Sequence, residues 1–339
     1  MRCGVCCTDA LGWRVVRARW ATCLPSAFDS VIFANPEDFG NPYLRRGFRT
    51  FAKQLAMRRA VRSLAGRVDR VIVASNGEAG FLPLRSAAQT MIYGDASHRQ
   101  LNDLYRFNRP EAKLRNRERQ MRRLAAHGAH FVGMSRWCSA GFEQDYQVVE
   151  CATIGPPMDT GLFPAQPPRS QVRRVLFVGG DFKRKGGEDL LAVAAQFSEL
   201  QFDIVSPGAP EQLPPNVLRH IGVGPQSPEL LARYANADAF VFPTHADCSP
   251  LAVLEAQASG LPVLCTSVGG LGDMVSDGVH GWVFSPGDRA ALHAALAESV
   301  AQPEVAASVG QAGRQRVERE NALAVHAVRW RTIAETMKP

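Results

Sequence analysis

The sequence predicts an α/β protein with two halves in tandem, each a parallel sheet covered by helices. At 339 residues, the chain is too long for one ordinary core and suits two domains. Short apolar segments of strand length alternate with helical segments in both halves, as in parallel sheets. The composition, 46% hydrophobic and 21% charged, is that of a globular protein, and no apolar run approaches the ~20 residues of a membrane span.

The first half shows the alternation only from residue 29 onward. Residues 10–28 have no clear period, and residues 1–30 show no first strand with a glycine-rich loop, so we interpret this region as diverged or truncated. The predicted strands cover residues 29–34, 70–74, 88–93 and 130–134. The predicted helices cover residues 45–65 and 109–127, and the second of these is strongly basic.

The second half begins after a proline-rich stretch, residues 154–172, which favours an extended linker. Strands are predicted at residues 175–178, 202–205, 239–242 and 262–265. Helices are predicted within residues 186–197, 228–235, 251–259, 288–300 and 321–337. The expected domains are therefore residues 1–165 and 170–320, followed by a C-terminal helix in residues 321–339.

The net charge of +7 is unevenly distributed. Residues 1–165 carry 24 Lys and Arg against 14 Asp and Glu, a net of +10, whereas the remainder carries 15 against 18. This asymmetry indicates an anionic partner for the first half, such as a lipid surface or a phosphorylated acceptor. The alternative is a solvated, arginine-rich surface. We expect no nucleic acid partner, because no zinc finger or RNA-recognition motif is present.

Three of the eight cysteines, Cys3, Cys6 and Cys7, cluster at the N-terminus. A metal site needs a second pair of ligands, and none follows, so we predict no metal and a frayed tip. The other cysteines lie in apolar surroundings and are expected to be reduced thiols. Since the N-terminal residues do not resemble a signal peptide, these features favour a cytoplasmic protein.

Glycines and cations follow the first predicted strand of the second half. Gly179 and Gly180 let backbone N–H groups approach a ligand, and Lys183, Arg184 and Lys185 add positive charge before a helix begins. This combination suits a diphosphate. The spacing matches neither of the common phosphate-binding motifs, so a tight turn with solvated basic residues is the alternative.

A second polar loop carries two carboxylates. Asp247 precedes a helix that opens near Ser249 and Pro250, and Glu255 lies within that helix in an apolar setting. Because Asp247 is in the loop, both carboxylates can face one site, where they suit the vicinal hydroxyls of a sugar and a ribose. The alternative is a helix-capping Asp with a surface Glu.

The region from Val175 to Asp288 resembles the GT-B glycosyltransferases, specifically the large retaining family 4, the glycosyl transferases group 1. The resemblance implies two Rossmann-like domains facing across a cleft, with the C-terminal helices returning to the first domain. The matching blocks, in order, are Gly179-Gly180, Lys185-Gly186, and residues 234–238, 241–243, 247–263, 268–271, 275–278 and 281–288.

The resemblance also implies roles for the loop residues. Asp247 and Glu255 correspond to the family's pair of acids seven residues apart, so Glu255 would hold the ribose and Asp247 the transferred sugar. Lys185 would neutralise the departing diphosphate. The donor-binding backbone would be that of Gly179, Gly180, Ser249, Pro250 and Leu251, with the side chain of Arg184 nearby.

Several positions depart from the family pattern. Gly180 stands where relatives often have Arg, and we expect Arg184 to substitute. Pro250 has no N–H to offer a phosphate. In the first half, where the resemblance is weaker, many relatives have a His near Gly94, whereas here Asp95 and the later His98 are the candidates. We predict that Asp95 is catalytic, with a cap at the end of a strand as the alternative.

Together these features predict a retaining glycosyltransferase that uses a UDP-, GDP- or ADP-sugar as substrate and needs no cofactor. The absence of an Asp-x-Asp triplet favours metal-independent chemistry. The acceptor would be a glycan or a lipid-linked molecule, with peripheral contact at the inner face of the membrane. The alternatives are an epimerase or sugar-phosphate synthase of the same fold, and a non-catalytic nucleotide-sugar-binding protein with a degenerate acceptor domain.

Overall fold

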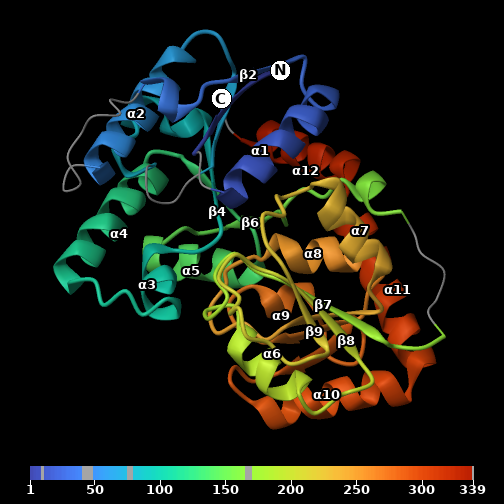
Figure 1. The fold of residues 1–339 in the computed structure, drawn as a ribbon. Coiled ribbons are helices and arrows are strands. Elements are labelled where there is room, and N and C mark those ends of the chain that lie inside the picture. The colour runs from blue at the N-terminus through green and yellow to red at the C-terminus, as the bar shows by residue number, and fades with distance from the viewer. Residues whose placement is uncertain (9–10, 40–48, 75–78, 165–169, 338–339) are drawn as a thin grey trace. The chain divides into compact units, whose positions relative to one another are not determined.

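A computed structural model describes residues 1–8, 11–39, 49–74, 79–164 and 170–337. The chain divides into two compact units, Met1–Pro157 together with Leu323–Pro339, and Met158–Ala322. Each unit is built on a six-stranded parallel sheet with helices packed against it, which confirms the predicted α/β architecture (Figure 1). None of the described helices combines the length and the apolarity needed to cross a membrane.

The sheet of the first unit has the strand order β2-β1-β3-β4-β5-β6, and buried apolar clusters cover both of its faces. Its strands are β1 (Arg2–Cys7), β2 (Ser30–Phe33), β3 (Arg70–Ala74), β4 (Thr90–Gly94), β5 (His130–Gly133) and β6 (Ala152–Thr153). Its helices are α1 (Leu11–Cys23), α2 (Arg49–Ser63), α3 (His98–Leu104), α4 (Glu111–Ala126), α5 (Arg136–Tyr146) and α12 (Leu323–Thr336). Short 3-10 turns are η1 (Leu24–Ser26), η2 (Pro36–Phe39), η4 (Ala79–Phe81) and η5 (Leu84–Gln89).

The N-terminal residues form the interior strand β1, so the predictions of a frayed tip and of no first strand are wrong. Cys3, Cys6 and Cys7 are all fully buried, and Cys3 lies in register with both Val31 and Arg70. A parallel strand inside a sheet buries both faces and therefore shows no alternation, and here small thiols occupy those positions. Burial raises the pKa of the Cys3 thiol to about 12, which keeps it protonated at neutral pH.

The C-terminal helix α12 packs in the first unit beside α1, which confirms the predicted return of the chain (Figure 1). His326 holds it there. Its Nε2 accepts hydrogen bonds from the indole N–H groups of Trp20 at 2.7 Å and Trp330 at 2.8 Å, and its Nδ1 lies 3.1 Å from the carbonyl oxygen of Gly155. These contacts need a neutral ring with its proton on Nδ1.

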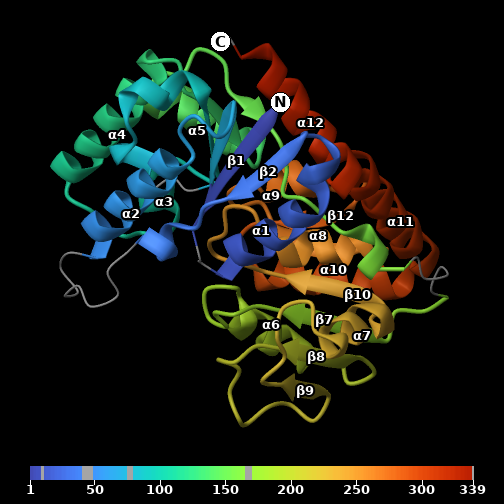
Figure 2. The same cartoon turned by 90° about the horizontal axis from the view of Figure 1, so that it is seen from above.

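The sheet of the second unit has the strand order β12-β11-β10-β7-β8-β9, with β9 at an edge (Figure 2). Its strands are β7 (Arg174–Val178), β8 (Gln201–Val205), β9 (Val217–His220), β10 (Ala239–Phe242), β11 (Val263–Thr266) and β12 (Gly281–Phe284). Its helices are α6 (Gly187–Ala194), α7 (Pro228–Asn236), α8 (Leu251–Ala258), α9 (Leu271–Met274), α10 (Arg289–Ala301) and α11 (Pro303–Glu320), with the 3-10 turn η6 (Thr160–Leu162). In this unit, β9, β12, α9 and α11 were not predicted from the sequence.

Helix α11 was missed because it packs through small residues. Gly310 lies against the turn after α8, where an added Cβ would be 2.3 Å from the carbonyl oxygen of Gly260. A contact made by backbone and glycine leaves no strong apolar stripe at helical spacing. The hydrophobic pattern therefore indicates this helix only weakly.

The chain passes between the two units at two neighbouring points. Met158 begins the second unit and Ala322 ends it, and the two form an isolated parallel bridge in which the Met158 N–H donates to the Asn321 carbonyl oxygen at 2.8 Å. Phe163 is buried in the second unit, so part of the proline-rich stretch packs against a core. Residues 165–169 of that stretch lie outside the described residues.

We expect acid to destabilise the first unit before its carboxylates titrate. Burial lowers the pKa of both His98 and His326 to about 3, whereas an unfolded histidine titrates near 6.5. The stability that the protein gains from keeping these two histidines neutral is therefore fully present above pH 6.5, and it is lost as the pH falls towards 3. From pH 6.5 to 5, each histidine should remove up to about 2 kcal/mol from the free energy of unfolding.

Urea denaturation followed by tryptophan fluorescence at a series of pH values measures this change, since four of the five tryptophans lie in the first unit. The variant His326→Gln cannot titrate at this position, so its loss of stability between pH 6.5 and 5 should be smaller than that of the parent protein by up to about 2 kcal/mol. An equal dependence in both proteins would contradict a neutral, buried His326.

Candidate functional site

Two loops of the second unit meet at the carboxyl ends of adjacent strands. β7 and β10 pair in parallel, with Leu176 opposite Phe240. Residues 179–186 connect β7 to α6, and residues 243–250 connect β10 to α8. Neighbouring parallel strands end at the same edge of a sheet, which is where open α/β sheets usually bind ligands.

The loop before α6 passes directly over the backbone of the second loop. Gly186 has a left-handed φ of 80°, and a Cβ at this position would lie 1.9 Å from the carbonyl oxygen of Pro243. Only glycine satisfies both the dihedral angle and the contact. This close approach places the preceding residue, Lys185, beside the second loop.

The structure brings the predicted residues Lys185 and Asp247 together in an ion pair. The side chains are 14% and 10% exposed, so the pair is largely withdrawn from water. The Lys185 Nζ also lies 5.1 Å from the centre of the Phe242 ring. An anion bound to Lys185 would compete with the Asp247 carboxylate for the ammonium group, and an exchange of partners would release the carboxylate for other hydrogen bonds.

Glu255 is buried in α8, where it accepts a hydrogen bond from the Tyr234 hydroxyl at 3.2 Å. The same hydroxyl lies 3.3 Å from the Ala252 carbonyl oxygen. Tyr234 therefore orients the carboxylate from α7. The sequence analysis did not single out this tyrosine, although it lies within a block that resembles the family.

Arg184 ties the two loops together. Its guanidinium contacts Asp181 at 3.1 Å through Nε and donates to the carbonyl oxygen of Ala246 at 2.6 Å through Nη1. Its own carbonyl oxygen accepts hydrogen bonds from the Thr244 hydroxyl at 3.1 Å and the His245 N–H at 2.9 Å. These bonds fix the position of Lys185 relative to Asp247.

The two glycines after β7 have different surroundings. A Cβ on Gly179 would lie 3.0 Å from the Cβ and Cγ of Lys185, so this position is tightly packed. Gly180 is exposed, and an added Cβ there would meet nothing within 4 Å. The structure therefore has room for a side chain at position 180.

Helix α8 begins without a side-chain cap. Pro250 occupies the N-cap with φ −70° and ψ 117°, and it has no N–H. The Ser249 hydroxyl oxygen is buried and has no hydrogen-bond partner among the residues that the structure describes. The groups available at this positive end of the helix are thus the Ser249 hydroxyl and the backbone from Leu251 onward.

Asp95 lies in the first unit, directly after β4, and is half-buried. Burial first, and then the nearby Cys138 and Asp95, raise the pKa of Tyr93 well above its usual value. Two residues further on, Ser97 caps α3 and its hydroxyl donates to Asp145. Because Asp95 directly follows β4, it lies at the carboxyl edge of the first sheet. Ligands of open α/β sheets usually bind at this edge.

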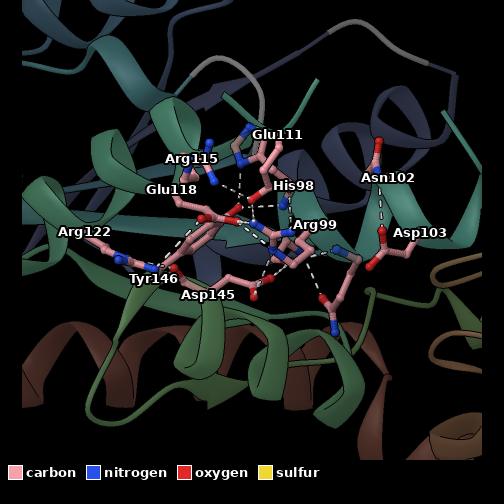
Figure 3. A network of polar contacts seen from close by, with 12 residues as sticks. His98, Arg99, Asn102, Asp103, Glu111, Arg115, Glu118, Arg122, Asp145 and Tyr146 are labelled. Carbon is pink, nitrogen blue, oxygen red and sulfur yellow. Dashed lines mark hydrogen bonds and ion pairs between the residues drawn. The ribbon is translucent and has the colours of Figure 1, made fainter. Parts of the chain in front are cut away.

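His98 is a packed core residue. Its Nδ1 lies 2.6 Å from the Tyr146 hydroxyl, and the ring is 4% exposed (Figure 3). Beside it, Arg99 donates to Glu118 at 2.9 Å and to Glu111 at 3.0 Å, which joins α3 to α4. This network joins the helices around His98, which is buried. Of the two candidates Asp95 and His98, Asp95 is therefore the more accessible.

Residues 172–302 match the sequence model of one protein family, described as glycosyl transferases group 1. This range includes both loops, the Lys185–Asp247 pair and the whole of α8. The match covers 131 of the 339 residues, so it shows what this part of the chain is similar to. The predicted resemblance of the second half is therefore confirmed at the level of the domain.

Sequence relatives share a short stretch with this chain. It is 40% identical over 89 residues to a glycogen synthase of Mycobacterium tuberculosis, which covers 26% of this chain and 22% of that protein. It is 35% identical over 97 residues to a sulfoquinovosyl transferase of Arabidopsis thaliana, which covers 28% of this chain and 19% of that protein. The matched stretch is thus about a fifth of the length of these relatives.

Solved structures match over nearly the whole chain. Sucrose-phosphate synthase from Thermosynechococcus elongatus superimposes with a TM-score of 0.77 at 18% identity, covering 99% of this chain and 98% of that one. HepE from Anabaena, in complex with UDP-glucose, gives 0.69 at 14% identity, covering 99% and 100%. These neighbours show that the fold is GT-B.

We expect Gly186→Ala to destabilise the second unit by about 2–4 kcal/mol, because the methyl group overlaps the Pro243 carbonyl and the left-handed φ disfavours alanine. Gly180→Ala is the matched control in the same loop and should change stability by less than about 0.5 kcal/mol. Chemical denaturation of both variants measures the difference. Equal stability of the two would contradict the described contact.

Proposed function

We propose that this protein is a metal-independent glycosyltransferase that moves a sugar, with retention of configuration, from a nucleotide-diphosphate-sugar donor to an acceptor. The observation that carries the proposal is the buried Lys185–Asp247 pair at the meeting point of two loops in a glycosyl transferases group 1 domain. A cation and a carboxylate that can separate match the two parts of such a donor, its diphosphate and its sugar hydroxyls.

Donor binding would exchange the partners of this pair. The diphosphate takes Lys185, and the released Asp247 accepts hydrogen bonds from the hydroxyls of the sugar. As the bond between the anomeric carbon and the diphosphate breaks, negative charge grows on the leaving oxygen. Lys185 and the N-terminus of α6 stabilise that charge within a site that excludes most water. The Ser249 hydroxyl and the Leu251 backbone contact the donor at the start of α8.

Glu255 would hold the ribose hydroxyls. Its orientation by Tyr234 supports this role, because a fixed carboxylate can accept two vicinal hydroxyls without losing further side-chain entropy. A structural neighbour was solved with UDP-glucose, which makes a UDP-sugar the first donor to test, before GDP- and ADP-sugars. In this arrangement Arg184 acts as a positioning residue, since its guanidinium is already bonded to Asp181 and Ala246.

The first unit would bind the acceptor, a glycan or a lipid-linked molecule, with Asp95 as its catalytic residue. We also propose that the protein works in the cytoplasm, in peripheral contact with anionic lipid at the inner face of the membrane. The net positive charge of residues 1–165 supports this contact. Nucleotide-sugar binding without any transfer would instead favour the non-catalytic alternative, which the missing N–H of Pro250 motivates.

Titration calorimetry with UDP, GDP and ADP tests the donor site. Lys185→Ala should weaken binding of the preferred nucleotide about 10- to 100-fold through loss of a charge-assisted contact, and Glu255→Ala should weaken it about 10-fold. Asp95→Asn is the control, because Asp95 lies in the other unit, and it should reduce transfer while leaving nucleotide affinity unchanged. Unaltered affinity in folded Lys185 and Glu255 variants would refute the site.

Asp247→Asn separates the two proposed roles of the ion pair. Removing the competing carboxylate should strengthen binding of the bare nucleoside diphosphate about 3- to 10-fold, since Lys185 no longer has to leave an anionic partner. The same variant should lose most transfer activity, because an amide holds the sugar hydroxyls less well. Calorimetry and a donor-consumption assay measure the two effects. Weaker binding of the nucleoside diphosphate would contradict the exchange of partners.

A further inference from the structure

The loop between α3 and α4 presents an aromatic side chain in a rigid and unfavourable backbone conformation. Phe107 is 50% exposed, and its neighbours Arg106 and Asn108 have left-handed φ angles of 51° and 49°. Such angles are rare in residues other than glycine and persist only where the surrounding structure imposes them.

Asn102 in α3 imposes the conformation of this loop. Its carbonyl oxygen accepts a hydrogen bond from the Phe107 N–H at 3.0 Å, and its side-chain oxygen accepts one from the Arg109 N–H at 2.9 Å. The amide of Asn102 is itself held by Asp103 at 3.1 Å (Figure 3). The exposure of Phe107 is therefore built into the fold rather than left to an unrestrained loop.

The Phe107 ring packs in part against its own chain. The Tyr105 ring stacks on it with centroids 5.4 Å apart and planes at 9°, and the Arg109 guanidinium lies over it at 4.7 Å. Half of the side chain nevertheless remains exposed. An exposed aromatic side chain beside an arginine suits insertion between lipid headgroups with the guanidinium at the level of the phosphates.

Helix α4, which follows directly, carries a stripe of positive charge. Arg115, Arg119, Arg122 and Arg123 fall within about 100° of one another around the helix axis. Arg115 and Arg122 have carboxylate neighbours in Glu111 and Glu118. Arg119 and Arg123 are exposed, and neither makes an ion pair within the part of the chain that the structure describes. α4 contains six cations and two carboxylates in all.

We propose that Phe107, Arg109 and the arginine stripe of α4 form a docking element for an anionic phospholipid bilayer. The ring edge enters the interface, and Arg119 and Arg123 contact the lipid phosphates along the helix. This inference deepens the proposed membrane contact by naming its residues. It assigns the unusual loop and the basic helix a single function, because each supplies one of the two signals that stable peripheral binding needs, apolar insertion and positive charge.

Co-sedimentation of the full chain with vesicles tests the element without donor or acceptor. Vesicles of phosphatidylcholine with about one-third phosphatidylglycerol should bind the protein at low salt, and pure phosphatidylcholine should not. Arg119→Gln with Arg123→Gln should weaken binding on the order of 20-fold. Phe107→Ser should weaken it about 10-fold, and Phe107→Trp should restore it.

Two variants in the same unit serve as matched controls. Arg62→Gln with Arg67→Gln removes two exposed charges near the end of α2, and Val328→Ser removes an apolar side chain that is 63% exposed on α12. Neither should change vesicle binding more than about twofold. If the Arg62/Arg67 variant lost as much vesicle binding as the Arg119/Arg123 variant, the attraction would be diffuse and the docking element would be overturned. Binding of the protein to a mixed-sequence oligonucleotide, without binding to vesicles, would also overturn it.

Nucleotide calorimetry on the same preparations separates this inference from the proposed transfer reaction. The docking variants should bind nucleoside diphosphate as the parent does, because their substitutions lie outside the glycosyl transferases group 1 domain. Loss of vesicle binding with intact nucleotide binding supports the docking element. Vesicle binding that survives in all of the docking variants refutes it, whatever the transfer assay shows.

Discussion

The close approach of Gly186 to the carbonyl oxygen of Pro243 is the constraint on which the proposed donor site depends. It brings the loop after β7 onto the loop after β10, and the hydrogen bonds of Arg184 then fix their relative position. This placement sets Lys185 beside Asp247, with which it forms an ion pair. The arrangement thus depends on backbone contact between two loops that follow neighbouring parallel strands.

A largely buried ion pair has consequences for binding. Separating Lys185 from Asp247 in a region of low dielectric is unfavourable unless each finds a new partner. A ligand that offers an anion and hydroxyls together satisfies both, whereas a simple anion satisfies only one. If the protein binds the proposed donor, the pair would therefore favour a complete nucleotide-sugar over free phosphate. This selectivity would arise from the requirement to satisfy Lys185 and Asp247 at the same time.

The candidate residues differ in how well sequence alone describes them. Lys185 follows a pair of glycines in a basic loop, Asp247 lies in a polar loop, and Glu255 lies in an otherwise apolar helix, so their types and spacing already indicate a site. Sequence alone describes Arg184 less well. Its charge suggests a phosphate ligand, whereas in the structure its guanidinium bonds to Asp181 and Ala246 and so connects the two loops. Tyr234 is a comparable case, since its contact with Glu255 joins α7 to α8 and has no signature in either segment.

The sequence by itself determined the tandem α/β class, most strands, and the resemblance of residues 175–288 to the glycosyl transferases group 1, because period, glycine placement and motif order are local properties. Only the tertiary structure showed that Cys3, Cys6 and Cys7 belong to an interior strand and that α11 packs through Gly310. It also decided the pairing of Lys185 with Asp247 and the exposure of Phe107. In each case the deciding contact joins residues far apart in the chain or depends on a backbone angle, and neither is encoded in local residue patterns.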